Sequence, residues 1–171
     1  KNTGKVISRD ISKQKIDLIR DNKERLCLNN IELQVYDALK LDTDLIQKAD
    51  LLIADLPCSG LGVIGKKSDI KYNMNIEKQK ELVRLQRDIL ETVSQYAKKD
   101  GSLIYSTCTV NKEENIKNLE WFLQNHSFEL ESLDSMIPKE LESETSKKGY
   151  LEIIPGIHDM DGFFIARLIR K

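Results

Sequence analysis

Two kinds of apolar pattern alternate along this chain of 171 residues. Residues 50–55 (DLLIAD) form a compact apolar run, which is typical of a strand buried on both faces of a parallel sheet. Residues 82–96 instead place apolar side chains at spacings of three and four, which predicts an amphipathic helix. Strand patterns that alternate with helix patterns indicate an α/β protein.

The alternation continues on both sides of these segments. Strand patterns cover residues 6–10, 31–36, 50–55, 101–107, 128–133, 150–154 and 163–169, and helix patterns cover residues 12–28, 82–96 and 113–125. Pro155-Gly156 and Asp161-Gly162 separate the last two strands, which predicts a hairpin-like pair. The polar stretch 138–149 is expected to be a mobile surface loop. We therefore predict one domain over residues 1–171, with a mostly parallel sheet and an antiparallel C-terminal strand.

Composition excludes several classes of protein. Hydrophobic residues make up 40 % and charged residues 32 %, which is too apolar for a disordered chain and too polar for a membrane protein. Residues 1–10 lack the apolar core of a signal peptide, and the three cysteines form no disulfide framework, so a reduced, cytoplasmic protein is expected. Lys plus Arg (27) nearly balances Asp plus Glu (28), so a nucleic-acid partner would have to be bound by a local basic patch.

Three cysteines are widely spaced along the chain. An odd number without a CxxC pair predicts neither a disulfide framework nor a zinc site, and no metal is expected. Cys27 is interpreted as a small buried residue on its helix. Cys58 and Cys108 each follow a predicted parallel strand. Because the carboxyl ends of parallel strands meet at one edge, both thiols are expected to face one crevice.

The segment 60–66 (GLGVIGK) satisfies two phosphate-binding patterns at once, GxGxxG and most of GxxxxGK. Both patterns need a helix that opens directly after the glycines, and residues 67–75 show no helical period. A flexible active-site loop that needs positive φ angles is therefore favoured. An NAD(P)- or nucleotide-binding enzyme that uses this loop is the first alternative.

Three aspartates also end predicted strands. Asp10, Asp37 and Asp55 would place their carboxylates along one rim of the sheet, where such groups commonly accept hydrogen bonds from ribose hydroxyls. The alternative is that each aspartate only starts a turn. The three carboxylates together with the two cysteines favour a nucleoside-type ligand.

Three segments resemble motifs of the RNA cytosine-5 methyltransferases. Residues 55–72 (DLPCSGLGVIGKKSDIKY) resemble the fourth motif of that family, residues 106–115 (STCTVNKEEN) the sixth, and residues 161–167 (DGFFIAR) the last. The best match is the bacterial ribosomal-RNA type called Sun or Fmu. The resemblance implies a Rossmann-like class I methyltransferase sheet, S-adenosylmethionine as cofactor and 16S ribosomal RNA as substrate.

The resemblance also implies a role for each site residue. Cys108 would be the nucleophile that adds to C6 of a cytosine, and Cys58 would assist release of the enzyme by elimination. Asp55 would lie between the cofactor and the target base and bind both. Asp10 and Asp37 would hold the ribose and adenine of the cofactor.

Lysines near the motifs are candidates for RNA binding. Lys71 is the predicted substrate-binding lysine, and Lys66, Lys67 and Lys112 could add phosphate contacts. The alternative is that these four side chains belong to an ordinary solvated surface.

One family motif does not occur in this sequence, namely the first strand and its glycine-rich Asp-x-Cys-Ala-Ala-Pro-Gly-Gly-Lys loop. In the family's sheet that strand lies between the strands predicted at residues 6–10 and 50–55. The chain is therefore expected to be a partial domain of a longer enzyme, inactive alone and a weak binder of cofactor. Unpaired strand edges would permit a strand-mediated homodimer. The second alternative is a non-catalytic interaction domain, which would be favoured by two buried and distant cysteines.

Overall fold

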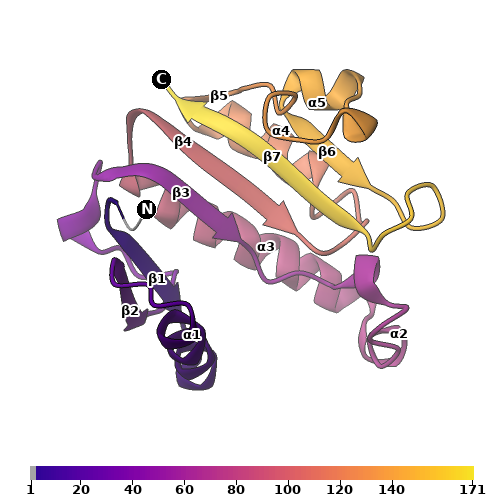
Figure 1. Cartoon of the computed structure of the whole chain (residues 1–171). Helices are drawn as coiled ribbons and strands as arrows, with labels where there is room; N and C mark the ends of the chain where they lie inside the picture. The colour runs from indigo at the N-terminus through magenta and orange to yellow at the C-terminus, as the bar shows by residue number, and fades with distance from the viewer. Residues whose placement is uncertain (1–2) are drawn as a thin grey trace. The chain divides into compact units, whose positions relative to one another are not determined.

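The computed structural model describes residues 3–171, and the chain divides into two compact units, Lys1–Leu41 and Asp42–Lys171. The first unit contains β1 (Val6–Asp10), α1 (Lys13–Arg25) and β2 (Ile31–Val35) (Figure 1). The strands β1 and β2 are parallel, with Val6 opposite Ile31 and Asp10 opposite Val35. This unit is a strand–helix–strand crossover, as the sequence patterns predict. The single domain predicted for residues 1–171 stays a prediction.

The helix α1 begins and ends on local signals. The Ser12 side chain accepts a hydrogen bond from the Lys15 N–H, as expected of an N-cap. At the other end the Leu28 N–H bonds the Lys23 carbonyl, and Cys27 has a φ angle of 52°. This left-handed ending is a Schellman motif, and it stops the helix three residues before the predicted end. The prediction for Cys27 is therefore wrong, because this cysteine lies past the helix and is exposed.

The second unit is built around a five-stranded sheet. Its strands are β3 (Ala49–Asp55), β4 (Ala97–Thr107), β5 (Phe128–Leu130), β6 (Tyr150–Ile153) and β7 (Phe163–Arg170). The order is β3-β4-β7-β5, and β6 also pairs with β7. The strand β4 is parallel to β3, whereas β7 is antiparallel to β4, β5 and β6. Four strands thus run one way and only the C-terminal strand runs the other way, which confirms the predicted sheet.

Two helices cover one face of this sheet in Figure 1, α3 (Ile76–Val93) and α4 (Ile116–Asn125). The core lies between these helices and the sheet. Its members that are at most 1 % exposed come from α3 (Leu90), β4 (Ala97, Leu103, Tyr105), α4 (Leu119, Phe122) and β7 (Phe164, Ala166, Leu168). Burial of these apolar side chains is the main stabilising contribution to the unit.

The stretch 138–149 is the clearest correction to the predicted elements. It holds a short 3-10 helix, η4 (Lys139–Leu141), and the helix α5 (Glu144–Lys148) rather than a loop. Ser143 and Ser146 form a capping box, and Gly149 ends the helix with a φ angle of 103°. Ser146 also donates to Asp134 Oδ1 at 2.5 Å. Polar residues that suggested a loop are used as caps.

The remaining elements are short turns around the strands, namely η1 (Thr43–Leu45), η2 (Leu61–Val63), α2 (Ile70–Asn73) and η3 (Ser94–Tyr96). The one-turn helix α2 lies in residues 67–75, where no helix was predicted. Within residues 42–171 β3 is an edge strand, and its Leu51 and Ile53 are 56 % and 66 % exposed. The homodimer stays a prediction. Of the helices in the described part of the chain, none is long and apolar enough to cross a membrane.

Candidate active site

The two cysteines that follow neighbouring parallel strands lie in contact. Cys58 comes three residues after the end of β3, and Cys108 directly follows β4. Their Sγ atoms are 3.2 Å apart, and both side chains are half-buried. The predicted placement of both thiols at one edge of the sheet is confirmed, whereas the crevice that they would face stays a prediction. The distant, buried pair that would have favoured a non-catalytic domain is not found.

The Cys58 thiol is held in its protonated form. Burial, together with the hydrogen bond to Cys108, raises the pKa of Cys58 to about 12. Cys58 therefore keeps its proton at neutral pH. Its S–H can act as the donor in the sulfur–sulfur contact, with Cys108 Sγ as the acceptor.

Asp55 lies at the same edge of the sheet as the cysteines. It is the last residue of β3, and its Oδ1 accepts a hydrogen bond of 2.9 Å from the hydroxyl of Ser106 on β4. The side chain is otherwise exposed. An ionised carboxylate has acceptor sites to spare after one such bond, so Asp55 can still accept from a ligand.

Asp10 and Asp37 belong to the first unit. Asp10 ends β1, where its Oδ1 accepts from the Ser12 N–H at 2.7 Å. Asp37 follows β2 by two residues, and its Oδ1 accepts from the Leu39 N–H at 3.0 Å. Both carboxylates thus lie at carboxyl ends of parallel strands and also stabilise turns. A rim shared with Asp55 stays a prediction.

The glycine-rich segment 60–66 is a compact loop rather than a phosphate cradle. Gly60 has a φ angle of 70°, as predicted for an active-site loop. The N–H groups of Val63, Lys66 and Lys67 donate to carbonyls within the loop, and the Gly62 N–H donates to the Cys108 carbonyl at 3.1 Å. Amides bonded in this way are not available to a phosphate group. The geometry therefore argues against the nucleotide-binding alternative.

A second glycine explains why the loop passes so close to its neighbour. The Gly162 N–H donates to the Gly62 carbonyl at 2.8 Å, and a Cβ on Gly62 would lie 2.2 Å from Gly162 O. Only glycine permits this approach of two backbones. The crossing ties the Cys58 loop to the turn between β6 and β7.

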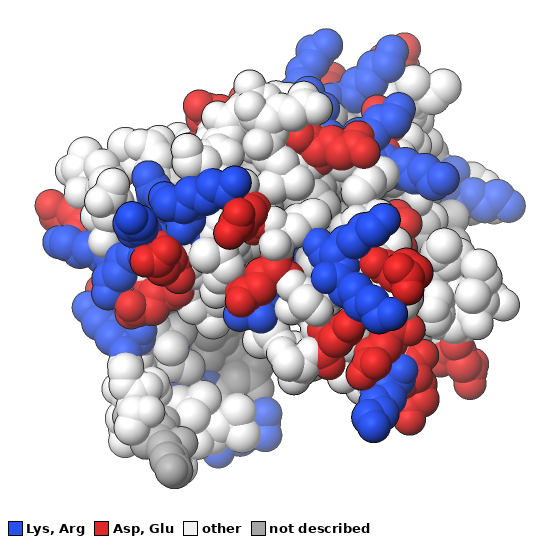
Figure 2. All heavy atoms as spheres, turned by 90° about the horizontal axis from the view of Figure 1, so that it is seen from above, with Lys and Arg blue, Asp and Glu red and all other residues white. Residues whose placement is uncertain are grey.

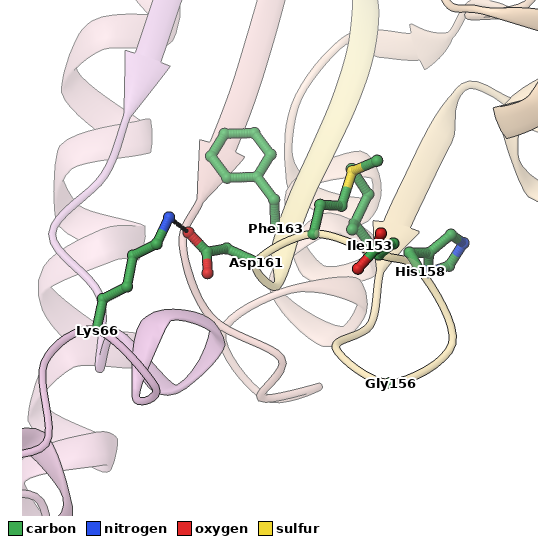
Figure 3. A pocket seen from close by; sticks show the side chains of 8 residues that line it. Lys66, Ile153, Gly156, His158, Asp161 and Phe163 are labelled. Atoms are coloured by element: carbon green, nitrogen blue, oxygen red, sulfur yellow. Dashed lines mark hydrogen bonds and ion pairs between the residues drawn. The ribbon is translucent and has the colours of Figure 1, made fainter.

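An open hollow of about 680 Å³ lies beside that turn (Figure 3). In the figure the Lys66 side chain points across to Asp161, and its Nζ donates to Asp161 Oδ2 at 2.6 Å. Phe163, Ile153 and His158 also line the hollow. Lys66 is therefore paired with the Asp161 carboxylate.

The other candidate lysines are exposed. Lys67 and Lys71 lie in the segment after β3, and Lys112 lies between β4 and α4. Figure 2 shows basic and acidic side chains interspersed over the face in view, in line with the net charge of −1. RNA binding by Lys71 stays a prediction.

Sequence reasoning missed four polar residues that are buried behind the cysteines. Gln86, Glu114 and Asn118 are 0 % exposed, and Asn115 is 1 % exposed. The signal was present for Gln86 and Asn115, which fall on the apolar stripes of two predicted helices, four residues from Leu82 and Leu119. Glu114 and Asn118 gave no such signal, because they lie off the apolar stripe of the predicted helix 113–125.

Comparisons with known proteins identify relatives of this chain. A model of the family described as "16S rRNA methyltransferase RsmB/F" matches residues 1–169. The "Probable ribosomal RNA small subunit methyltransferase B" of Bacillus subtilis is 37 % identical over 174 residues, which cover 100 % of this chain and 39 % of that protein. The chain thus spans about two fifths of the length of this relative.

Two solved structures share the fold. A methyltransferase homolog protein from Pyrococcus horikoshii is 28 % identical with a TM-score of 0.80, over 99 % of this chain and 54 % of that one. NSun6 from the same organism was solved with the S-adenosylmethionine analogue SFG. It is 27 % identical with a TM-score of 0.79, over 99 % of this chain and 42 % of that one. The match over nearly the whole chain shows that this protein belongs to the RsmB/F family of 16S rRNA methyltransferases.

Proposed function

We propose that the protein methylates carbon 5 of a cytosine in 16S ribosomal RNA through a covalent bond between Cys108 and C6 of the base. The observation that carries the proposal is the contact of 3.2 Å between Cys58 Sγ and Cys108 Sγ at the ends of two parallel strands. The family supports the rRNA substrate and the methyl transfer. A cytoplasmic location follows from that substrate.

Cytosine C5 is a weak nucleophile, so the reaction needs activation of the ring. Addition of the Cys108 thiolate to C6 pushes the electrons of the C5–C6 double bond onto C5, which then attacks a methyl group. S-adenosylmethionine, the methyl donor of the family, supplies that group when bound. Transfer of the C5 proton to water then restores the C5–C6 double bond, and the C6–S bond breaks to release Cys108 as a thiolate.

The two thiols are proposed to have different roles, because burial holds Cys58 in its protonated form. The raised pKa of Cys58 makes it a poor nucleophile at neutral pH, which leaves Cys108 to attack. The Cys58 S–H is in place to donate a hydrogen bond to Cys108 Sγ while the C6–S bond breaks. This donation stabilises the leaving thiolate and assists release.

The carboxylates would bind the two substrates. Asp55 is exposed beside the thiols, and its carboxylate suits the exocyclic amino group of cytosine, which is a hydrogen-bond donor. Asp10 and Asp37 have acceptor sites beyond their turn bonds, which fit the ribose hydroxyls and the adenine amine of the cofactor. Lys71 would contact the RNA backbone.

Covalent trapping tests this proposal. The full-length protein is incubated with S-adenosylmethionine and a cytosine-containing 16S rRNA fragment, and adducts are read on a denaturing gel. Cys58→Ala is expected to accumulate the adduct, because release is impaired while attack is not. Cys108→Ala is expected to give none, and Cys27→Ala serves as the control. Normal methylation by Cys108→Ala would contradict the assignment.

A further inference from the structure

We propose that Glu114 and Asn115 are positioning residues, each of which holds one of the two cysteines so that the sulfur atoms stay in contact. The inference rests on the proposed function for its catalytic meaning. Both residues lie between β4 and α4 and are almost completely buried. Neither is assigned a role in the methyl-transfer steps above.

Glu114 holds the segment that carries Cys58. Its Oε2 accepts a hydrogen bond of 2.8 Å from the Ser59 N–H, which belongs to the peptide after Cys58. Gln86 Nε2 donates to the Pro57 carbonyl at 2.8 Å, on the peptide before Cys58, and also to Glu114 Oε2 at 3.0 Å. The peptides on both sides of Cys58 are therefore fixed to one pair of side chains.

Asn115 holds the segment that carries Cys108 in the same way. Its Oδ1 accepts a hydrogen bond of 2.6 Å from the Thr107 hydroxyl, before Cys108. Its Nδ2 donates to the Thr109 carbonyl at 2.9 Å, after Cys108. Both neighbours of Cys108 are thus bonded to one amide group.

A further bond joins the two segments directly. The hydroxyls of Ser59 and Thr109 are 2.8 Å apart, and both residues are buried. The Tyr105 hydroxyl also donates to the Glu114 carbonyl, which anchors the dipeptide to β4. The hydrogen bonds of Glu114 and Asn115 are thus joined into one network around the two cysteines, which we call the polar frame. Such a network fixes a geometry more firmly than isolated bonds do.

The choice of a carboxylate at position 114 is informative. Within the described part of the chain, its hydrogen-bond donors are neutral, namely the Ser59 N–H and the side-chain amides of Gln86 and Asn111. Burying a charge in neutral surroundings is costly, and an apolar residue of similar size often gives equal or greater stability. A role in stability alone therefore accounts poorly for Glu114, whereas a role in fixing the Cys58 peptide accounts for it well.

Disulfide closure between the two cysteines measures their placement without RNA or cofactor. Diamide takes two electrons and two protons from the thiol pair, which becomes a disulfide while diamide becomes the hydrazine. The measurement uses the protein with Cys27→Ser, so that the exposed thiol does not compete. The closure rate is followed by mass spectrometry of the alkylated protein, and peptide mapping identifies the bond.

Two substitutions remove hydrogen bonds of Glu114 and Asn115, and a third substitution at a neighbouring exposed residue serves as the control. Glu114→Met keeps the length of the side chain but no acceptor, and Asn115→Asp keeps the shape but loses the donor to Thr109. Glu113→Met is the control, because Glu113 is exposed and pairs only on the surface with Lys117. We expect closure at least about tenfold slower in the first two variants, or about 1.4 kcal/mol, and less than about twofold slower in the control.

Folding is checked by urea unfolding of each variant. A positioning role predicts slow closure even where the unfolding midpoint is unchanged, which a merely structural role would not produce. If Glu114→Met or Asn115→Asp fails to fold, Thr107→Val, which deletes only the hydroxyl bonded to Asn115, decides the matter by the same measurement. Folded variants that close at the wild-type rate would overturn the inference.

The same variants separate this inference from the proposed function. In the full-length protein, kcat for methylation is expected to fall with the closure rate while KM for S-adenosylmethionine stays constant. Slow closure in a protein that forms no RNA adduct would reject the proposed function and leave the positioning intact. Normal closure in variants of a protein that does form the adduct would reject the positioning alone.

Discussion

Replacing Gly62 by alanine should destabilise the site, because the backbones of Gly62 and Gly162 are in close contact. The added Cβ would lie 2.2 Å from Gly162 O, 2.7 Å from Gly162 C and 2.8 Å from Cys108 O. All three are backbone atoms, so no side chain can turn away. Ordinary contact begins at 3.4 Å, and the loop must therefore retreat by 1.2 Å (3.4 − 2.2).

A shift of that size breaks the bond between the Gly162 N–H and the Gly62 carbonyl, which is 2.8 Å long in the wild type. One lost hydrogen bond costs about 0.5–1.5 kcal/mol. Overpacking of a rigid site costs about 1–3 kcal/mol. Together they predict that Gly62→Ala lowers the free energy of unfolding by about 1.5–4.5 kcal/mol.

Gly65→Ala is the matched control, because it lies in the same loop and a Cβ there would meet no atom within 4 Å. It should leave stability unchanged or raise it by up to about 1 kcal/mol, since alanine restricts the unfolded chain. Urea unfolding of both variants gives the comparison. A difference between them below about 0.5 kcal/mol would refute the reasoning, because the crossing would then not require glycine.

Three further predictions concern ionisation and ligand binding. The pKa of Cys58 is raised to about 12, whereas an unfolded thiol has a pKa of about 8.5. The free energy of unfolding should therefore fall as pH rises from about 9 to 12, and pH-dependent unfolding should show a smaller fall in Cys58→Ala. Burial lowers the pKa of His126, against the opposing effect of Glu91, so stability should fall as pH drops below about 6.5. An equal fall in His126→Gln would contradict this. Isothermal titration of the 171-residue chain with S-adenosylhomocysteine should show affinity weaker than micromolar, because the glycine-rich first motif does not occur in it. Micromolar binding would show that the motif is dispensable.

The sheet could be predicted because its signals are local. The strands predicted at 6–10 and 50–55 match β1 and β3 to within one residue, since apolar side chains mark a buried strand directly in the sequence. The same reasoning placed Cys58 and Cys108 at one edge. It needed only the rule that carboxyl ends of neighbouring parallel strands lie together.

Boundaries and caps were harder to predict, because they depend on a few competing hydrogen bonds. The helix α3 begins at Ile76, six residues before its predicted start, where the Asn75 side chain accepts from the Lys78 N–H. Cys27 was misplaced because a Schellman ending can be made by a residue other than glycine. Neither outcome is visible in apolar periodicity.

The polar frame behind the cysteines lay beyond local patterns altogether. Ser59 and Glu114 are 55 positions apart, and Gln86 and Glu114 are 28 apart. Each bond exists only because β3, α3 and the segment before α4 meet in the fold. A sequence pattern indicates which residues are polar, but it does not indicate which of them will be buried together.

The adjacency of Glu114 and Asn115 gives this frame a property that separate anchors would lack. Glu114 holds the Cys58 segment and Asn115 holds the Cys108 segment, so both segments are hydrogen-bonded to neighbouring residues of the chain. Gln86 on α3 adds a second anchor for the Cys58 segment through the Pro57 carbonyl, and its bond to Glu114 Oε2 joins that anchor to the same pair of residues. On the proposed mechanism this matters, because attack by Cys108 and its release assisted by Cys58 both depend on that one distance.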